Sequence, residues 1–426
     1  MTLSRQLRLA VSIAVIATVI VACSPPQAQQ ERETGSSVKI GFLRPSTGPF
    51  AANGLDMEHG WELYWSQHGN RAAGKTVETT VEDTAGNPSV AINKANLLFD
   101  NRHVDMLVGP LAANEGLAVA DAMGRKDVPI VMPIVSADDL TQRKPVQNVV
   151  RLAGWTSSQT THPLGEYAHS RGYRKIVTIG YDFAFGYEGV GGFVNTFTDK
   201  GGRVVKQLWS PTNTQDYSTY VAQIKNSKPD AVFAMLSGAD ASRFFKAYND
   251  FGLRKTIPLL GGETLTDQSV LKSLGDGAEG LVSSGHFVEG ADAPETQQFV
   301  EDFYAKYKKY PSYYSANTYA AASGVAKALE ALNGDVSDAA AVVKALKGVS
   351  LTQTPMGPQK LDSHGNPVFD VSIRKVAKGP HGLWNVPTKT YDRVGQFWHY
   401  DPKEFLRHPV YSKSYQGAGV WPNPRK

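Results

Sequence analysis

The stretch Gly41–Gly54, GFLRPSTGPFAANG, lies where a β-strand is expected to turn into an α-helix. The apolar run VKI precedes it, and the amphipathic segment LDMEHGWELYWSQHG follows it. The stretch also carries Arg44, Ser46 and Thr47, whose side chains are able to contact a polar ligand. Because ligands of open α/β sheets bind beyond the carboxyl ends of the strands, this stretch is a candidate wall of a binding site.

The same alternation of strand and helix extends from this stretch along most of the chain. In the first part, the apolar runs that predict strands are VKIGFL (38–43), KTVETTVED (75–83), VDMLVGP (104–110) and VPIVMP (128–133). Helical patterns separate these runs, and a second alternating set of similar size occupies residues 148–287. Repeated β-α units with Val- and Ile-rich strands predict parallel sheets that are covered on both faces. The fold class predicted is therefore α/β, with two doubly wound lobes.

The composition changes to long helical patterns after Gly285. Because the second sheet is then complete, these helices are predicted to return to the first lobe. A β-hairpin with its turn at His364–Pro367 follows, and the stretch from Gly379 onward, which has no clear periodicity, is expected to wrap a surface. The chain is thus predicted to cross between the lobes three times, near Ala153, near Gly285 and near the hairpin. Three adjacent crossings form a hinge that closes around a ligand.

The first 22 residues have the pattern of an export signal. Arg5 and Arg8 precede a mainly apolar run that is short for a membrane span. Ala22 stands immediately before Cys23, which resembles the lipobox of bacterial lipoproteins, where the cysteine carries lipid. Cys23 is the only cysteine in the chain, so no internal disulfide is expected. An ordinary signal peptide with a chance cysteine is the alternative.

These patterns divide the chain into four predicted parts. They are a signal peptide (1–22), a lipid-anchored tether (23–37), an N-terminal lobe (38–152 plus 286–355) and a C-terminal lobe with a C-terminal wrap (153–285 plus 356–426). The predicted location is the periplasm, with the protein held at a membrane by the lipid on Cys23. Which membrane holds the anchor stays open.

The charge balance gives no electrostatic basis for binding nucleic acid. The formal net charge is +4, and loss of residues 1–22, which hold two Arg and no acidic residue, leaves +2. With 41% hydrophobic residues the chain is able to build a core, and its 426 residues suggest two domains.

No catalytic motif is present in the sequence. It contains no G-x-S-x-G, no G-x-x-x-x-G-K-[ST] and no H-E-x-x-H, and the glycines of GYEGVGG do not have dinucleotide-binding spacing. Glu166 and His169 stand three apart on a predicted helix, but a metal site needs further ligands, so a solvated helix face is favoured over a metal pair. We therefore predict a protein that is not an enzyme, with no cofactor and no metal.

Several stretches together are similar to one known family. They are KIGFLRPSTGPFAANGLDMEHG, VDMLVGPLAANEGLAVA, VPIVMPIVSADDLT, VVRLAGWTSSQ, KIVTIGYDFAFGYEGV, DYSTYVAQIKNSKPDAVFAML, IPLLGGETL and PSYYSANTYAA. Their order and spacing, over about Val38 to Val376, resemble the solute-binding lipoproteins of branched-chain amino acid ABC transporters, which have the type I periplasmic binding protein fold. The resemblance implies a small-molecule solute and an ABC permease as partners.

The resemblance also implies how the first lobe binds a ligand carboxylate. The loops GPLAAN and PIVSAD match those whose main-chain amides and hydroxyls hold it, an arrangement that a helix N-terminus favours. Ser136 falls on the family's hydroxyl position and Ile134 on a backbone contact. Ala113 replaces a serine of the amino acid binders, which puts strict amino acid recognition in doubt. Asn114 is either a substitute for that serine or a helix N-cap.

Three positions of the second lobe are implied in the same way. Phe185 matches an aromatic residue that closes over the ligand. Glu263 matches an acid that pairs with a ligand ammonium, although a carboxylate near a helix N-terminus is also stabilising on its own. Ser237 stands where the family has a tyrosine, and its smaller side chain makes room for a bulkier ligand.

Further residues around the opening stretch complete the predicted site. Arg44 either clamps a ligand carboxylate or pairs with a neighbouring acid at the rim of the cleft. Phe50 and Asn53 are expected to shape the side-chain pocket. Trp155, Tyr181 and Phe183 are able to stack on a ligand ring, but ordinary core packing is favoured for each.

The predicted function is that of an extracytoplasmic substrate-binding protein of an ABC uptake transporter. The solute is a small carboxylate, with a branched-chain or aromatic amino acid first and an aromatic or dicarboxylic acid as the alternative. A second hypothesis for a protein of this fold is a ligand sensor that signals to a membrane receptor.

Overall fold

The computed structural model describes residues 36–417, so Cys23 and the predicted signal lie outside the described residues. The first of two sheets has the strand order β2-β3-β1-β4-β5-β6. Its strands are β1 (Ser37–Arg44), β2 (Arg71–Ala72), β3 (Lys75–Asp83), β4 (Met106–Val108), β5 (Ile130–Val131) and β6 (Val149–Val150). All neighbours except β2 and β3 pair in parallel. β1 lies in the middle of this sheet, which explains why its apolar residues are buried on both faces.

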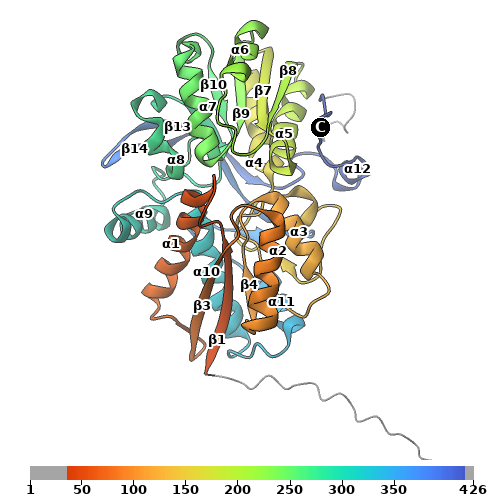
Figure 1. Ribbon diagram of the computed structural model, residues 1–426, viewed down its shortest axis with the longest axis vertical. Helices are drawn as coiled ribbons and strands as arrows, with labels where there is room; N and C mark the ends of the chain where they lie inside the picture. The colour runs from red at the N-terminus through yellow and green to blue at the C-terminus, as the bar shows by residue number, and fades with distance from the viewer. Residues whose placement is uncertain (1–35, 418–426) are drawn as a thin grey trace, which may run out of the picture. The chain divides into compact units, whose positions relative to one another are not determined.

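Helices cover both faces of the first sheet (Figure 1). They are α1 (Ala51–Gln67), α2 (Pro88–Asn96), the π-helix η1 (Leu97–Asn101), α3 (Ala113–Met123), the 3-10 helix η2 (Asp138–Leu140), α10 (Tyr313–Ala331) and α11 (Ala339–Gly348). α1 packs against α10, and α2 packs against α3. The long helices after Gly285 therefore do return to the first sheet, as the sequence predicts.

The second sheet has the order β12-β13-β11-β10-β9-β7-β8, with β14 on the outer side of β13. Its strands are β7 (Lys175–Tyr181), β8 (Arg203–Ser210), β9 (Ala231–Met235), β10 (Leu259–Gly261), β11 (Val282–Gly285), β12 (Lys360–Leu361), β13 (Pro367–Gly379) and β14 (Gly382–Val394). The strands β7 to β11 are parallel, whereas β12, β13 and β14 add an antiparallel edge. The predicted fold class, two lobes with parallel α/β sheets, is confirmed.

The helices of the second lobe lie on both sides of this sheet. They are α4 (Ser157–Ser170), α5 (Ala184–Asp199), α6 (Ser218–Ser227), α7 (Gly238–Asp250), η3 (Leu253–Lys255), η4 (Glu263–Leu265), α8 (Gln268–Leu274) and η5 (Asp276–Ala278). Two further helices, α9 (Pro294–Tyr307) and α12 (Pro402–Arg407), lie outside this alternating part of the chain. No helix within residues 36–417 is both long and apolar enough to cross a membrane.

The structure corrects the prediction for the stretch after Gly379. Its first part is not an irregular wrap but the 13-residue strand β14, which pairs with β13 along most of its length. Most β14 residues are exposed or half-buried, so the strand has no inward-facing apolar side to create an alternating pattern. The predicted turn at His364–Pro367 does lie between two paired strands, β12 and β13.

Buried polar contacts join the segments that run between the two sheets. Gln159 donates through its amide to the carbonyls of Pro367 (2.9 Å) and Val394 (2.8 Å). The fully buried Arg151 donates to Asn366 Oδ1 at 2.9 Å. Arg151 and Gln159 flank the first crossing, and Asn366 and Pro367 lie at the hairpin, so these contacts join two of the three crossings at which the sequence predicts a hinge.

Candidate ligand-binding site

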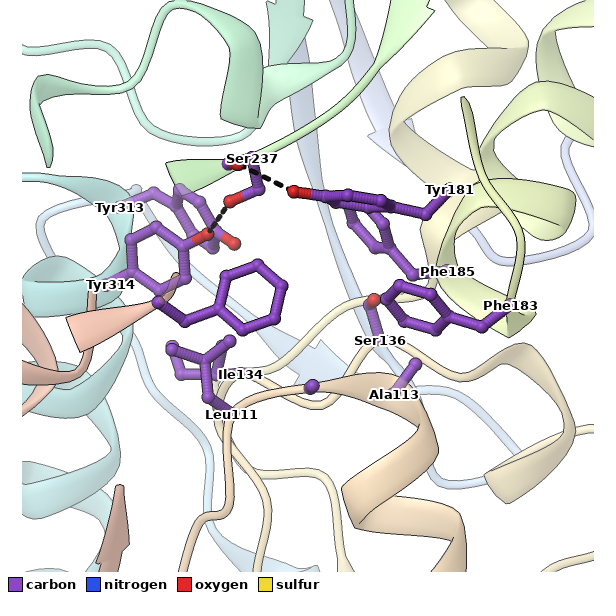
Figure 2. Close-up of a pocket in the computed structure, with 12 residues that line it drawn as sticks. Leu111, Ala113, Ile134, Ser136, Tyr181, Phe183, Phe185, Ser237, Tyr313 and Tyr314 are labelled. Carbon is purple, nitrogen blue, oxygen red and sulfur yellow. Dashed lines mark hydrogen bonds between the residues drawn. The ribbon is translucent and has the colours of Figure 1, made fainter. Parts of the chain in front are cut away.

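A small pocket lies between residues of the two lobes. Figure 2 shows it enclosed by aromatic rings on two sides, with Ser237 at one end and Ala113 and Ser136 toward the other. Its lining consists of Phe50, Leu111, Ala112, Ala113, Ile134, Ser136, Tyr181, Phe183, Phe185, Ser237, Tyr313 and Tyr314. Within the described part of the chain, the lining residues include no acidic and no basic side chain. Six predicted site residues meet in this pocket, namely Phe50, Ala113, Ile134, Ser136, Phe185 and Ser237.

The start of α3 forms one end of the pocket. Gly109 has φ +98° after β4, and a Cβ there would lie 2.2 Å from the carbonyl oxygen of Leu43, so only glycine allows this close turn. Glu115 accepts a hydrogen bond from the Ala112 N–H at 2.9 Å, which closes the first turn, and burial raises the pKa of Glu115 to about 7. First-turn N–H groups have no partner within a helix, so this end of the pocket, at Ala113, favours an anion.

Ser136 adds a hydroxyl at the same end. Its oxygen accepts a hydrogen bond from the hydroxyl of Ser157 at 2.8 Å, and its carbonyl accepts from the Ser157 N–H at 2.8 Å. Ser157 therefore holds the Ser136 side chain in place, while the Ser136 proton stays available for a ligand oxygen. The sequence prediction did not include Ser157, which lies on α4 after the first crossing of the chain.

Aromatic rings make up the walls of the pocket. Phe183 lies 5.3 Å from the Tyr181 ring and 6.1 Å from the Phe185 ring, between centroids. Phe50 contacts Tyr181 edge to face at 6.1 Å. Trp155 is fully buried behind Phe185 and does not line the pocket, in agreement with core packing for that residue. The arrangement presents apolar ring faces and edges to a flat ligand.

The second polar end of the pocket surrounds Ser237. Its hydroxyl lies 2.8 Å from the hydroxyl of Tyr314, and its carbonyl accepts a hydrogen bond from the Tyr181 hydroxyl at 2.8 Å (Figure 2). Tyr181 also donates toward Asp240 (3.0 Å), which forms an ion pair with Arg243 (2.8 Å). Tyr313 and Tyr314 were not predicted as site residues, although they lie in the family-like stretch PSYYSANTYAA.

Glu263 does not line this pocket. It is fully buried, with Arg374 Nη1 3.1 Å and His286 Nδ1 2.7 Å from its carboxylate oxygens, and the N–H of Phe287 donates to it at 3.1 Å. Burial acts to raise the pKa of Glu263, but His286 and Arg374 outweigh burial and leave that pKa below its usual value. The carboxylate predicted to pair with a ligand ammonium is therefore already paired within the chain.

Three other predicted residues also lie outside the pocket lining. Arg44 forms a salt bridge with Glu58, which is the rim pairing named above as the alternative to a carboxylate clamp. Asn53 is buried and donates to the Ser269 hydroxyl at 2.8 Å. Asn114 lies inside the first turn of α3, where its side chain accepts from the next N–H, so it is not the N-cap.

Glu166, which with His169 forms the possible metal pair on α4, contacts a lysine instead. Glu166 lies 3.2 Å from Lys200 Nζ, in an ion pair at the surface. Within residues 36–417, no group of three or more His, Cys, Asp or Glu side chains is arranged to hold a metal ion. The contact with Lys200 agrees with the interpretation of Glu166 as part of a solvated helix face.

Direct hydrogen bonds connect the two lobes beside the pocket. Glu188 on α5 accepts from the N–H of Asp138, two residues beyond Ser136, at 3.0 Å. Asp267 accepts from the N–H of Tyr313 at 3.0 Å. The structure therefore has the lobes in contact around the pocket, and two of these contacts involve buried carboxylates.

The carboxylate of Asp267 should make stability depend on pH. Its pKa is raised from 3.8 to about 7, mainly by burial, and the charge of Asp56, which is paired with Lys309, acts in the same direction. The folded protein then binds a proton that the unfolded chain releases, so the free energy of unfolding should fall as pH rises from about 4 to 7. Between pH 5 and pH 8, the free energy of unfolding should fall by about 2 kcal/mol less in Asp267→Asn than in the wild-type protein, as measured by urea unfolding at both pH values. Exposed Asp276→Asn is the control, and an unchanged pH profile in Asp267→Asn would contradict the prediction.

Two α/β lobes around a pocket of aromatic rings and hydroxyls define a ligand-binding protein of the hinged, two-lobed class. Residues 37–380 match the family of periplasmic binding proteins. Leu/Ile/Val-binding protein homolog 6 of Brucella abortus is 31% identical over 366 residues, which are 84% of this chain and 92% of that protein. The chain therefore belongs to the periplasmic binding proteins, in the branched-chain amino acid transporter family.

Solved structures agree with this assignment. An ABC transporter substrate-binding protein from Sphaerobacter thermophilus matches with a TM-score of 0.77 and 31% identity, over 84% of this chain and 99% of that chain. An ABC transporter solute-binding protein from R. palustris, solved in complex with benzoate, matches with a TM-score of 0.79 and 28% identity, over 84% and 97%. Both the family and these structures are solute-binding proteins, and the periplasmic binding family implies a location outside the cytoplasm.

Proposed function

We propose that this protein binds a small aromatic monocarboxylate and delivers it to an ABC uptake transporter. The observation that carries the proposal is the lining of the pocket, which combines six aromatic rings with hydroxyls and a helix N-terminus. The aromatic ring of the ligand would lie among Phe50, Tyr181, Phe183 and Phe185. Its carboxylate would lie at the start of α3, where Ser136 donates a hydrogen bond and the helix dipole favours the negative charge.

The state of Glu263 favours this ligand over an α-amino acid. A buried ammonium needs an anionic partner, because an unpaired charge is costly to remove from water. Glu263 is paired with Arg374 and His286 outside the pocket lining, and the described residues that do line the pocket include no carboxylate. The benzoate complex of the R. palustris protein supports the same ligand class. The Leu/Ile/Val-binding name of the Brucella relative favours an amino acid, which is the competing ligand class to test.

Calorimetry and thermal unfolding with a small panel test the proposal. Benzoate should raise the melting temperature, whereas benzamide, which keeps the ring but lacks the charge, should not. A ligand at 100 times its Kd stabilises the folded state by about 2.7 kcal/mol, which is readily measured. Leucine and phenylalanine are the matched amino acids. A shift with leucine but none with any aromatic acid would replace this proposal with amino acid binding.

We propose further that the protein is anchored by lipid on Cys23, which lies outside the described residues. The support is the sequence alone, an apolar signal followed by a small residue and the only cysteine of the chain. Labelling of cells with a radioactive fatty acid tests this proposal. Label on the wild-type protein but not on Cys23→Ser is expected, and equal labelling of the two would exclude the anchor.

A further inference from the structure

We infer that the Ser237 end of the pocket recognises a hydroxyl group on the ligand ring, opposite the carboxylate. This inference rests on the proposed function, since it takes the carboxylate to lie at the start of α3. Three hydroxyls of this chain, those of Ser237, Tyr313 and Tyr314, gather at that end of the pocket (Figure 2). The ligand class that fits both ends is a hydroxylated aromatic acid.

The hydrogen bonds among these hydroxyls leave one proton for a ligand. Ser237 Oγ lies 2.8 Å from Tyr314 Oη, and this contact uses the proton of only one of the two hydroxyls. The proton of the other hydroxyl is not used in this contact. The nearby Tyr181 hydroxyl has one proton, which it shares between the carbonyl of Ser237 and the carboxylate of Asp240. The three-hydroxyl cluster is therefore able both to donate to a ligand oxygen and to accept from one.

Burial makes this polar end selective. Ser237 is 4% exposed, Tyr313 is 2% exposed and Tyr314 is 1% exposed, so these groups have little access to water. A site built to hydrogen-bond a hydroxyl discriminates strongly against an analogue without one, because its own polar groups are then left unpaired. A ring with hydrogen or a methyl group at this position should bind more weakly for this reason.

The same contact would join the two lobes. Ser237 immediately precedes α7 of the second lobe, whereas Tyr314 lies on α10, which packs against α1 of the first lobe. A ring hydroxyl that contacts both Ser237 and Tyr314 would hydrogen-bond to both lobes at once. Recognition of the hydroxyl would then favour the closed arrangement of the lobes, in the way that a ligand shifts a hinged protein toward the state it binds better.

Calorimetric titration of four ligands, namely benzoate, 4-hydroxybenzoate, 3-hydroxybenzoate and 4-methylbenzoate, tests the inference. The wild-type protein should bind 4-hydroxybenzoate at least tenfold more tightly than benzoate or 4-methylbenzoate. Ser237→Ala should reduce the ratio of the 4-hydroxybenzoate affinity to the benzoate affinity several-fold. Ser237 makes no side-chain cap for α7, so its replacement leaves the helix start intact. Tyr314→Phe is the second variant, and it should reduce the same preference.

Ser136→Ala is the matched control, because it removes a hydroxyl from the other end of the pocket. It should weaken the binding of benzoate and of 4-hydroxybenzoate by the same factor. Equal wild-type affinities for these two acids, or a preference that neither Ser237→Ala nor Tyr314→Phe changes, would overturn the inference and leave the proposed function standing. Binding of no aromatic acid at all would instead reject the proposed function, and this inference with it.

Discussion

Replacing Arg374 with methionine should lower the free energy of unfolding by about 3–5 kcal/mol, because it takes the guanidinium away from the buried carboxylate of Glu263 and leaves only the His286 contact. Arg374 is 1% exposed and Glu263 is fully buried. The guanidinium donates to the carboxylate of Glu263 (3.1 Å), to its carbonyl (2.7 Å) and to the carbonyl of Phe287 (2.5 Å). It also donates to the hydroxyls of Thr266 (3.3 Å) and Ser283 (3.0 Å). Methionine fills part of the volume but makes none of these bonds.

Urea unfolding measures this effect, with Lys375→Met as the control. Lys375 is the next residue of β13 and is exposed, so its replacement should change the unfolding free energy by less than about 0.5 kcal/mol. Glu263→Gln in the Arg374→Met background removes the unpaired charge and should recover about 1–2 kcal/mol. Equal stabilities of Arg374→Met and Lys375→Met would show that the buried ion pair does not matter for stability.

The second large effect is expected at the floor of the pocket, where Ala113→Leu should weaken ligand binding at least 100-fold. Ala113 is 2% exposed and lines the pocket at the start of α3. A leucine there would occupy the space proposed for the ligand carboxylate and would cover the N–H groups of the first turn. A 100-fold loss corresponds to about 2.8 kcal/mol of binding free energy. Calorimetry with the tightest-binding aromatic acid of the panel measures the loss.

Ala122→Leu on the same helix separates loss of binding from damage to the helix. Ala122 is exposed, so this variant should bind as well as the wild type. Thermal unfolding of both variants shows whether the fold is intact, because overpacking of a buried alanine has its own cost of about 1–3 kcal/mol. Full binding by Ala113→Leu would place the ligand somewhere other than this end of the pocket.

Much of the fold could be predicted because its signals are local. Short Val- and Ile-rich runs such as that of β1 are buried on both faces, and this burial requires continuous apolar sequence. The return of α10 to the first lobe was predicted because the strands of the second sheet are already complete before this helix begins. The strand β14 was missed because its exposed residues need no apolar alternation, and only its pairing with β13 makes it a strand.

The candidate site was predictable only in part. The resemblance to the solute-binding family implied Ala113, Ile134, Ser136, Phe185 and Ser237 as site residues, and all five line the pocket. Their roles toward a ligand stay predictions. The same resemblance assigned Glu263 to a ligand ammonium, and no sequence signal connects Glu263 with its distant partner Arg374 on β13.

The sequence by itself determined the α/β class, the two lobes and the strand-to-helix loops of the first lobe, because these depend on the apolar pattern of neighbouring residues. Only the tertiary structure decided which side chains share the pocket and which are already paired. Tyr314 meets Ser237 across 77 positions, and Arg374 meets Glu263 across 111. Contacts over such separations depend on how whole elements pack, and a charged or hydroxyl side chain looks the same in the sequence whether its partner is a ligand or another residue of the chain.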